Sequence, residues 1–276
     1  MKMIRANYRR TISICAIMIA MASMAACASV PAGQEKRVTA SDVERSRRLL
    51  AIVQDINKKA VDSYSAQFTV EGVFGKSKFN SIGEALYNRN PRMARLTFFD
   101  IVFKSPLTIL VQDGTALKFY FPAEKTLYLD SIETINLKNY AAIDIDFALL
   151  YPFASGQIPV LDGHSIKQGL IAENDSNRSY LVLENRDYFQ TISFSGDFPD
   201  KILYIRKSNR NKTEFYLEKP HREKTGLFYR KIRMLAPDSG GRLSFTFSEI
   251  RYDVRMDAAS MLKINLDKGA KIVNMQ

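Results

Sequence analysis

From residue 68 onward, apolar and polar residues alternate with a period of two in one short run after another. In the first run, Phe68 and Val70 alternate with Thr69 and Glu71. Successive side chains of a strand point to opposite faces of a sheet, so this pattern is typical of half-buried β-strands. The dipeptide Asp113-Gly114 is a strong hairpin turn between two such runs. We therefore predict an antiparallel meander, with further runs at 83–88, 93–103, 107–112, 116–121, 126–129, 179–184, 188–194, 201–207, 212–218, 227–235, 242–249 and 251–256.

Two segments have helical character instead. Ser41 and Glu44 form a capping box ahead of apolar residues at helical spacing, which predicts an amphipathic helix at about 42–61. A second, apolar helix is expected after Asp144, carrying Phe147, Leu150 and Phe153 over the sheet. The fold class is therefore α+β, with about eleven strands and two or three helices.

The first 27 residues have the pattern of a bacterial lipoprotein signal. A basic head and a short apolar run at 11–23 precede Met24-Ala25-Ala26-Cys27, which resembles a lipobox. Processing would attach diacylglycerol to the Cys27 sulfur, cleave before it and acylate the new amine with a fatty acid such as palmitate. The alternatives are a secretory signal cut after Ala28 and an uncleaved helix. The chain divides into a signal peptide at 1–26, the lipidated cysteine and a flexible tether at 27–40, and one domain at 41–276.

The exported part of the chain is basic and has no disulfide available. Removing the four basic residues of the signal leaves 36 Lys and Arg against 29 Asp and Glu, a formal charge of +7. Cys15 leaves with the signal and Cys27 would be acylated, so stability must come from an apolar core. Outside the cytoplasm, this charge favours anionic lipid as a partner and not nucleic acid. The densest basic run, at 206–212, either binds lipid head groups or is a solvated hairpin turn.

The sequence contains no pattern typical of catalysis. His164 and His221 are its only histidines, and it lacks His-Glu-x-x-His, Gly-x-Ser-x-Gly and paired cysteines. Asp144-x-Asp146 is better explained by the start of a helix than by metal ligation. We therefore expect no enzymatic activity, no cofactor and no metal.

The order of these features resembles the LolA/LolB superfamily of periplasmic lipoprotein carriers and outer-membrane lipoprotein receptors, and most closely its LolB branch. The resemblance rests on the lipobox, on the helix before the first strand, and on the segments MARLTFFDIVFKSPLTILVQDGTALKFYFPAEKTLYLD at 93–130, DIDFALLYPFASGQIP at 144–159 and MLAPDSGGRLSFTFSEIRYDV at 234–254. It implies an incomplete, strongly curved antiparallel barrel with helices covering its open side. Such a barrel would enclose an apolar cavity that receives acyl chains.

The resemblance and the apolar strand faces together name the residues that would line this cavity. They are Phe68, Val70, Leu96, Phe98, Leu107, Ile109, Phe119, Phe121, Leu127, Phe147, Leu150 and Phe153. For each of them the alternative is ordinary core packing. Receptor-type members also carry an apolar residue on an exposed loop that contacts the membrane. Phe74, with Lys76 and Lys78 nearby, is the candidate for that contact, and a plain hairpin loop is the alternative.

The resemblance implies a lipid-anchored, monomeric protein on the periplasmic face of the outer membrane, because Ala28 stands where an Asp would retain a lipoprotein in the inner membrane. Its partners would be outer-membrane lipid, acylated lipoprotein cargo and a LolA-like periplasmic carrier. It would bind acyl chains and help deliver lipoproteins, or another lipid, to the outer membrane. The alternative is a non-transporting envelope module for assembly or stress sensing on the same scaffold.

Overall fold

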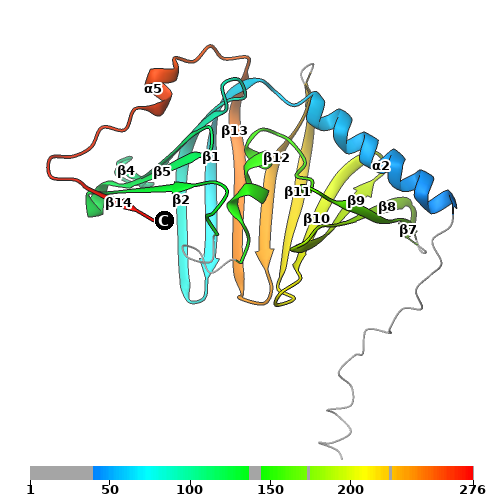
Figure 1. Cartoon of the computed structure of the whole chain (residues 1–276). Helices are drawn as coiled ribbons and strands as arrows, with labels where there is room; N and C mark the ends of the chain where they lie inside the picture. Colours follow the sequence, from blue (N-terminus) through cyan, green and yellow to red (C-terminus); the bar gives the residue numbers. More distant parts are fainter. Residues whose placement is uncertain (1–39, 137–143, 173–174, 224–225, 276) are drawn as a thin grey trace, which may run out of the picture. The chain divides into compact units, whose positions relative to one another are not determined.

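The computed structural model describes residues 40–136, 144–172, 175–223 and 226–275 (Figure 1). The predicted signal peptide, Cys27 and the tether up to residue 39 lie outside the described residues. The helices are α2 (Ala40–Lys58), α4 (Tyr151–Ala154) and α5 (Ala258–Leu262), with short 3-10 turns η1 (Pro122–Glu124) and η2 (Phe147–Leu149). The strands are β1 (Ser63–Phe74), β2 (Ser77–Asn88), β3 (Met93–Phe99), β4 (Pro106–Asp113), β5 (Ala116–Phe121), β6 (Thr126–Ser131), β7 (Ser165–Ala172), β8 (Asp175–Glu184), β9 (Tyr188–Ser195), β10 (Phe198–Arg206), β11 (Lys212–Glu223), β12 (Gly226–Ala236), β13 (Gly241–Tyr252) and β14 (Lys271–Asn274).

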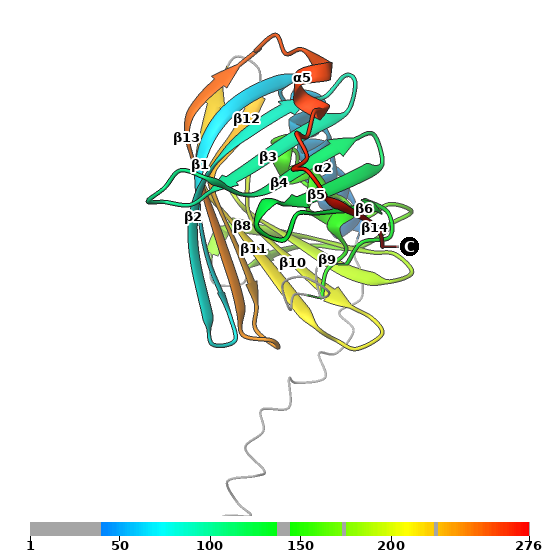
Figure 2. The same cartoon turned by 90° about the vertical axis from the view of Figure 1, so that its left-hand side faces the viewer.

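The strands form one large curved sheet that does not close into a barrel (Figure 2). Their order is β14-β6-β5-β4-β3-β2-β1-β13-β12-β11-β10-β9-β8-β7, and neighbours are antiparallel except β14, which pairs in parallel with β6. The sheet has 14 strands, so the expected number of about eleven was too low. The sequence pattern misses both edge strands. The short β14 is exposed throughout, and a register shift between Ile166 and Gln168 interrupts the alternation of β7.

The first helix covers one end of this sheet. Leu49, Val53 and Ile56 of α2 are buried in an apolar cluster with residues of β8 to β12, and the helix lies along the β7 and β8 end (Figure 1). A side chain on Gly169 of β7 would come within 2.7 Å of the Ser46 backbone nitrogen, so glycine lets the helix approach closely. None of the helices in the described part of the chain has the length and apolar character that a membrane span requires.

The segment after Asp144 packs on the same face of the sheet as Phe68 and Val70, which we call the inner face. It is the 3-10 turn η2 followed by the four-residue α4, and not the single capped helix predicted from the sequence. No side chain caps η2, because Asp144 and Asp146 bind other groups, described below. The Tyr64 hydroxyl of β1 donates a hydrogen bond to the Ala154 carbonyl oxygen at 2.5 Å, which holds α4 against the sheet.

The C-terminal residues pass over the opposite, outer face of β3 to β6 (Figures 1 and 2). Arg95 donates to the carbonyl oxygens of Met261 at 3.2 Å and Lys263 at 2.6 Å, and the Tyr120 hydroxyl donates to the Asp267 carboxylate at 2.7 Å. Leu262 and Ile264 then cover an apolar cluster on that outer face. This wall of the sheet therefore has apolar packing on both sides.

Candidate functional site

An apolar cavity of about 560 Å³ lies between the inner face of the sheet and the η2–α4 segment. All but two of the residues predicted to face a cavity line it, including Phe68, Leu96, Phe119 and Phe153. Its lining residues are Tyr64, Phe68, Val70, Phe74, Phe79, Ser81, Ala94, Leu96, Phe98, Leu107, Thr108, Leu110, Gln112, Phe119, Phe121, Phe147, Leu150, Tyr151, Phe153, Ala154, Phe215, Ile232, Met234, Leu243, Phe245 and Phe247. No charged side chain is among these described residues, so the cavity suits an apolar ligand.

Ile109 and Leu127 are the exceptions, and their predicted place in the cavity was wrong. Both are buried on the outer face, in the cluster that Leu262 and Ile264 cover. The strand Leu107-Thr-Ile-Leu-Val111 is apolar on both faces, so its alternation does not say which face is inner. The C-terminal segment packs on one face of β4, and the other face lines the cavity with the side chain of Leu110.

Leu107 lines the cavity although Ile109, two residues later, points outward. The register between β3 and β4 shifts at this point, where Phe98 pairs with Thr108 and Phe99 pairs with Pro106. A bulge of this kind redirects a side chain to the other face of a sheet. Leu107 is also 43% exposed, which places it at the mouth of the cavity.

Two aromatic rings lie directly on glycines of the neighbouring strand. A Cβ on Gly83 would come within 2.3 Å of the Phe68 ring, and a Cβ on Gly72 within 2.0 Å of the Phe79 ring. Each glycine is the cross-strand partner of the ring that covers it. Phe68 also makes edge contacts with Phe98, whose ring centroid is 5.2 Å away. These rings form a closely packed floor and leave the remaining space as one cavity.

The η2–α4 segment is tied to the sheet by a network of polar contacts, which we call the Asp144–Arg206 cluster. Arg206 of β10 donates to the Asp146 carboxylate at 2.9 Å and its Nε lies 3.1 Å from Asp144. The Tyr188 hydroxyl donates to Asp146 at 2.7 Å, and Asn209 donates to Asp144 at 2.6 Å. Arg206 is thus a partly buried ion-pair partner, and the basic run that contains it is more than a solvated turn.

This cluster predicts acid sensitivity. Burial raises the pKa of Asp144, but hydrogen bonds from Asn209 and Asn211 and the charge of Arg206 outweigh it and hold that pKa below its ordinary value. A lowered pKa stabilises the fold above the unfolded-state pKa, and this contribution disappears as pH falls through the folded-state pKa. Asp144→Asn should therefore lower the free energy of unfolding at pH 7, and the difference from wild type should shrink below about pH 4.

Denaturant unfolding between pH 3 and 7 measures this difference. Asp162→Asn, at an exposed position, is the matched control and should behave as wild type. A pH-independent difference for Asp144→Asn would mean that its carboxylate charge contributes nothing to holding the segment.

Phe74, the predicted membrane-contact residue, ends β1 beside the exposed turn at 75–76, but its own side chain is not exposed. It is half-buried, lines the cavity and stacks on Phe79 with ring centroids 5.6 Å apart. The exposed apolar tip is instead the loop between β3 and β4, where Val102 is 77% and Phe103 is 82% exposed.

The alternation of residues predicts a strand that extends through 101–103, whereas β3 ends at Phe99. Asp100 turns the chain there, since its carboxylate accepts hydrogen bonds from the backbone nitrogens of Val102 at 2.8 Å and Phe103 at 2.7 Å. The sequence signals for this turn are Asp100 and the Ser105-Pro106 pair that ends the loop. The loop leads directly to Leu107 at the mouth of the cavity.

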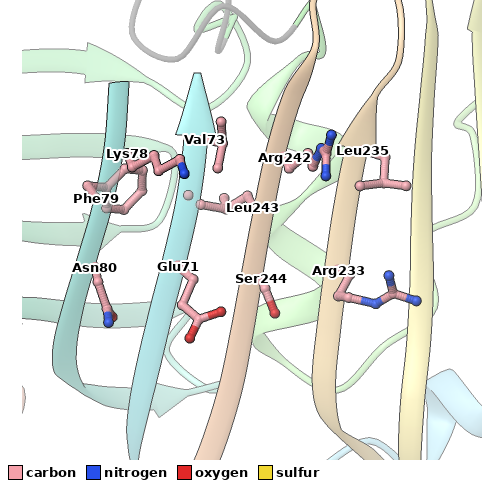
Figure 3. A pocket seen from close by; sticks show the side chains of 11 residues that line it. Glu71, Val73, Lys78, Phe79, Asn80, Arg233, Leu235, Arg242, Leu243 and Ser244 are labelled. Atoms are coloured by element: carbon pink, nitrogen blue, oxygen red, sulfur yellow. The ribbon is translucent and has the colours of Figure 1, made fainter. Parts of the chain in front are cut away.

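A second depression, of about 610 Å³, lies across β2, β1, β13 and β12 (Figure 3). Glu71 and Val73 line it, and they alternate with the cavity residue Val70, so it belongs to the outer face. Lys78, Arg233 and Arg242 also line it, which makes it a charged surface groove. The apolar cavity is therefore the better candidate for a lipid site.

No family model and no curated protein matches this sequence. Among solved structures, the fold is similar to a LolA superfamily protein from Nitrosomonas europaea, at 12% identity and a TM-score of 0.54 over 78% of this chain and 97% of that one. A domain from Vibrio parahaemolyticus named for outer-membrane lipoprotein sorting matches at 11% identity and a TM-score of 0.58, over 78% and 97% of the two chains. A DUF1329 family protein from Desulfovibrio piger matches at 12% identity and a TM-score of 0.57, over 79% of this chain and 99% of that one. At these identities the likeness is one of fold, and the described chain has a LolA-like fold.

Proposed function

We propose that this protein is a LolB-like lipoprotein, anchored to the periplasmic face of the outer membrane, that binds acyl chains and helps deliver lipoproteins or another lipid to that membrane. The observation that carries the proposal is the cavity of about 560 Å³, whose described lining residues are mostly apolar or aromatic and carry no charge, and which opens beside an exposed apolar loop. The LolA-like fold supports it, as does the lipoprotein-sorting name of one protein that shares this fold.

The cavity would capture cargo by the hydrophobic effect alone. Each methylene that leaves water contributes about 0.8 kcal/mol, so a long chain gains many kcal/mol without nucleotide hydrolysis. Chains would arrive from a LolA-like periplasmic carrier and move on to the bilayer if affinity rises at each step. The alternative, an envelope module for assembly or stress sensing, would bind the chain and keep it.

The exposed loop between β3 and β4 would contact the outer membrane. Val102 and Phe103 present apolar side chains to water, and Lys104 beside them is also exposed. Apolar residues next to a cation suit the surface of an anionic bilayer. Because Leu107 at the mouth follows this loop, a chain leaving the cavity would be released close to the lipid.

Transfer of a fluorescent acyl probe tests the proposal. A form of the protein beginning at Ala28 keeps every described helix, strand and apolar cluster, since all lie after residue 39. We call it the Ala28 form. It should bind the probe saturably with about 1:1 stoichiometry and pass it to anionic vesicles. Saturable binding without transfer would favour the sensing module, and no saturable binding would contradict both roles in lipid handling.

The anchor is tested with the full chain. Cys27→Ala should abolish acylation and leave the protein either uncleaved or released from membranes by a salt wash, because several acyl chains are needed for stable anchoring. Mass spectrometry of the N-terminal peptide and membrane fractionation measure the two effects. Salt-resistant membrane association of a cleaved Cys27→Ala protein would contradict a lipid anchor at this residue.

A further inference from the structure

We propose that Lys104 and Lys125 form a binding site for the anionic head group of a lipid whose chain occupies the cavity. The inference rests on the proposed acyl binding and adds to it the chemical class of the head group. Lipoprotein cargo would bind in the same cavity through its acyl chains, with or without this contact.

The head group of such a ligand belongs at the mouth of the cavity. None of the described lining residues carries a charge, so an ionised head group inside would lose its hydration without compensation. The lining residue Leu107 stands near the start of β4 and is 43% exposed, so the mouth lies at this end of the strand. Cations close to Leu107 are therefore the groups that an anionic head group would meet.

Two turns bring a lysine to this end of the sheet. The strands β3 to β6 are consecutive antiparallel neighbours, so the β3–β4 loop and the β5–β6 turn lie at the same end. Lys104 is three residues before Leu107, so their Cα atoms are at most about 11 Å apart. Lys125 ends the turn η1, which contacts β4 and begins at Pro122, directly after the cavity residue Phe121.

Both lysines have a backbone conformation that residues with a Cβ disfavour. The angle φ is 54° at Lys104 and 50° at Lys125, in the left-handed region where glycine is the usual residue. Lysine at both turns therefore indicates a use for the side chain that the backbone does not require. Lys219 of β11 has the same conformation, with a φ of 55°, but five strands separate β11 from β4 in the sheet. It provides a matched control.

The described carboxylates leave both ammonium groups available. Lys104 and Lys125 are exposed, and no ion pair with either is found in the described part of the chain. Of the carboxylates in the same two turns, that of Asp100 accepts hydrogen bonds from two backbone nitrogens of its own loop. That of Glu124 accepts one from the Tyr128 hydroxyl at 3.5 Å. A phosphate or carboxylate would give the two lysines the charge-assisted hydrogen bonds that these groups do not supply.

Competition between amphiphiles that differ in their head group tests the proposal. A fatty acid, a one-chain phosphatidylglycerol and a fatty alcohol of equal chain length displace a fluorescent acyl probe from the Ala28 form, below their micelle concentrations. The anionic ligands should bind at least about tenfold more tightly than the alcohol at low salt, and this preference should shrink as salt rises. The larger of the two preferences shows whether a carboxylate or a phosphate fits better.

Glycine variants remove the charges without straining the fold. Lys104→Gly combined with Lys125→Gly should fold, because glycine adopts both φ values freely. This double variant should bind the alcohol as wild type does and lose most of its preference for the anionic ligands. Lys219→Gly makes the same change elsewhere in the sheet and should keep the preference. Arginine at positions 104 and 125 together retains both charges and should keep it as well.

An unchanged anionic preference in the folded double glycine variant would overturn the head-group site and leave acyl binding intact. An equal loss in Lys219→Gly, or no preference in wild type, would do the same. Slower transfer to anionic vesicles with unchanged affinity for all three ligands would assign the two lysines to the bilayer and not to the ligand. If wild type bound none of the three amphiphiles, the proposed function would be refuted, and the inference with it.

Discussion

Phe119→Glu in the Ala28 form is expected to weaken binding of an acyl probe by at least about a hundredfold at pH 7.5 while the sheet stays folded. Phe119 is half-buried on β5, pairs with Leu110 across the strands and lines the cavity beside it. A glutamate there would place a carboxylate against the bound chain. Burying an ionised carboxylate without a partner costs several kcal/mol, unless the group takes up a proton instead.

Fluorescence titration measures the affinity, and circular dichroism with denaturant unfolding shows that the variant is folded. The matched control is Lys118→Glu, the adjacent residue of β5, whose side chain points to the outer face and should leave acyl affinity unchanged. Partial recovery of binding to Phe119→Glu below about pH 5 would support the same mechanism, because the protonated side chain is neutral. Wild-type affinity in folded Phe119→Glu would mean that acyl chains bind elsewhere.

Replacing both Val102 and Phe103 with serine is expected to slow transfer of the bound probe to anionic vesicles by about tenfold to a hundredfold. Each of these side chains would move from water into the bilayer, and full burial of one such side chain is favourable by about 1.5–3 kcal/mol. Neither is packed in the fold, since they are 77% and 82% exposed. The free energy of unfolding and the affinity for the probe should therefore remain close to wild type.

A second exposed apolar residue provides the control. Val43 on α2 is 41% exposed and far along the chain from the β3–β4 loop, so Val43→Ser should not alter transfer. Stopped-flow transfer rates at low and at physiological salt separate the apolar contribution of the loop from that of Lys104, because only the latter is screened. Unchanged transfer in the double serine variant would rule out this loop as the membrane contact.

Most residues predicted to line the cavity do so, whereas Phe74, predicted to be exposed on a loop, is half-buried, and the difference has a physical cause. Phe68 and Val70 belong to strands whose polar and apolar faces are distinct, so the buried face follows from alternation. Phe74 and Phe103 both lie near polar turn residues in the sequence, so no local pattern indicates which of the two side chains is exposed in the fold. Only the cross-strand pairing of Gly72 with Phe79 gives Phe74 an aromatic partner, while Phe103 has none described.

The sequence by itself determined the class of fold, because alternation with a period of two and its hairpin turns depend on residues close together in the chain. It also determined that a helix precedes the sheet and that most strands have one apolar face. The tertiary structure decided which face of β4 and β6 is inner, since the C-terminal segment covers Ile109 and Leu127 from a point more than a hundred residues later. It likewise decided that Asp144 and Asp146 bind Arg206 and do not cap a helix, because the arginine comes from a distant hairpin. Contacts between distant segments, which leave no local pattern, therefore shape the cavity.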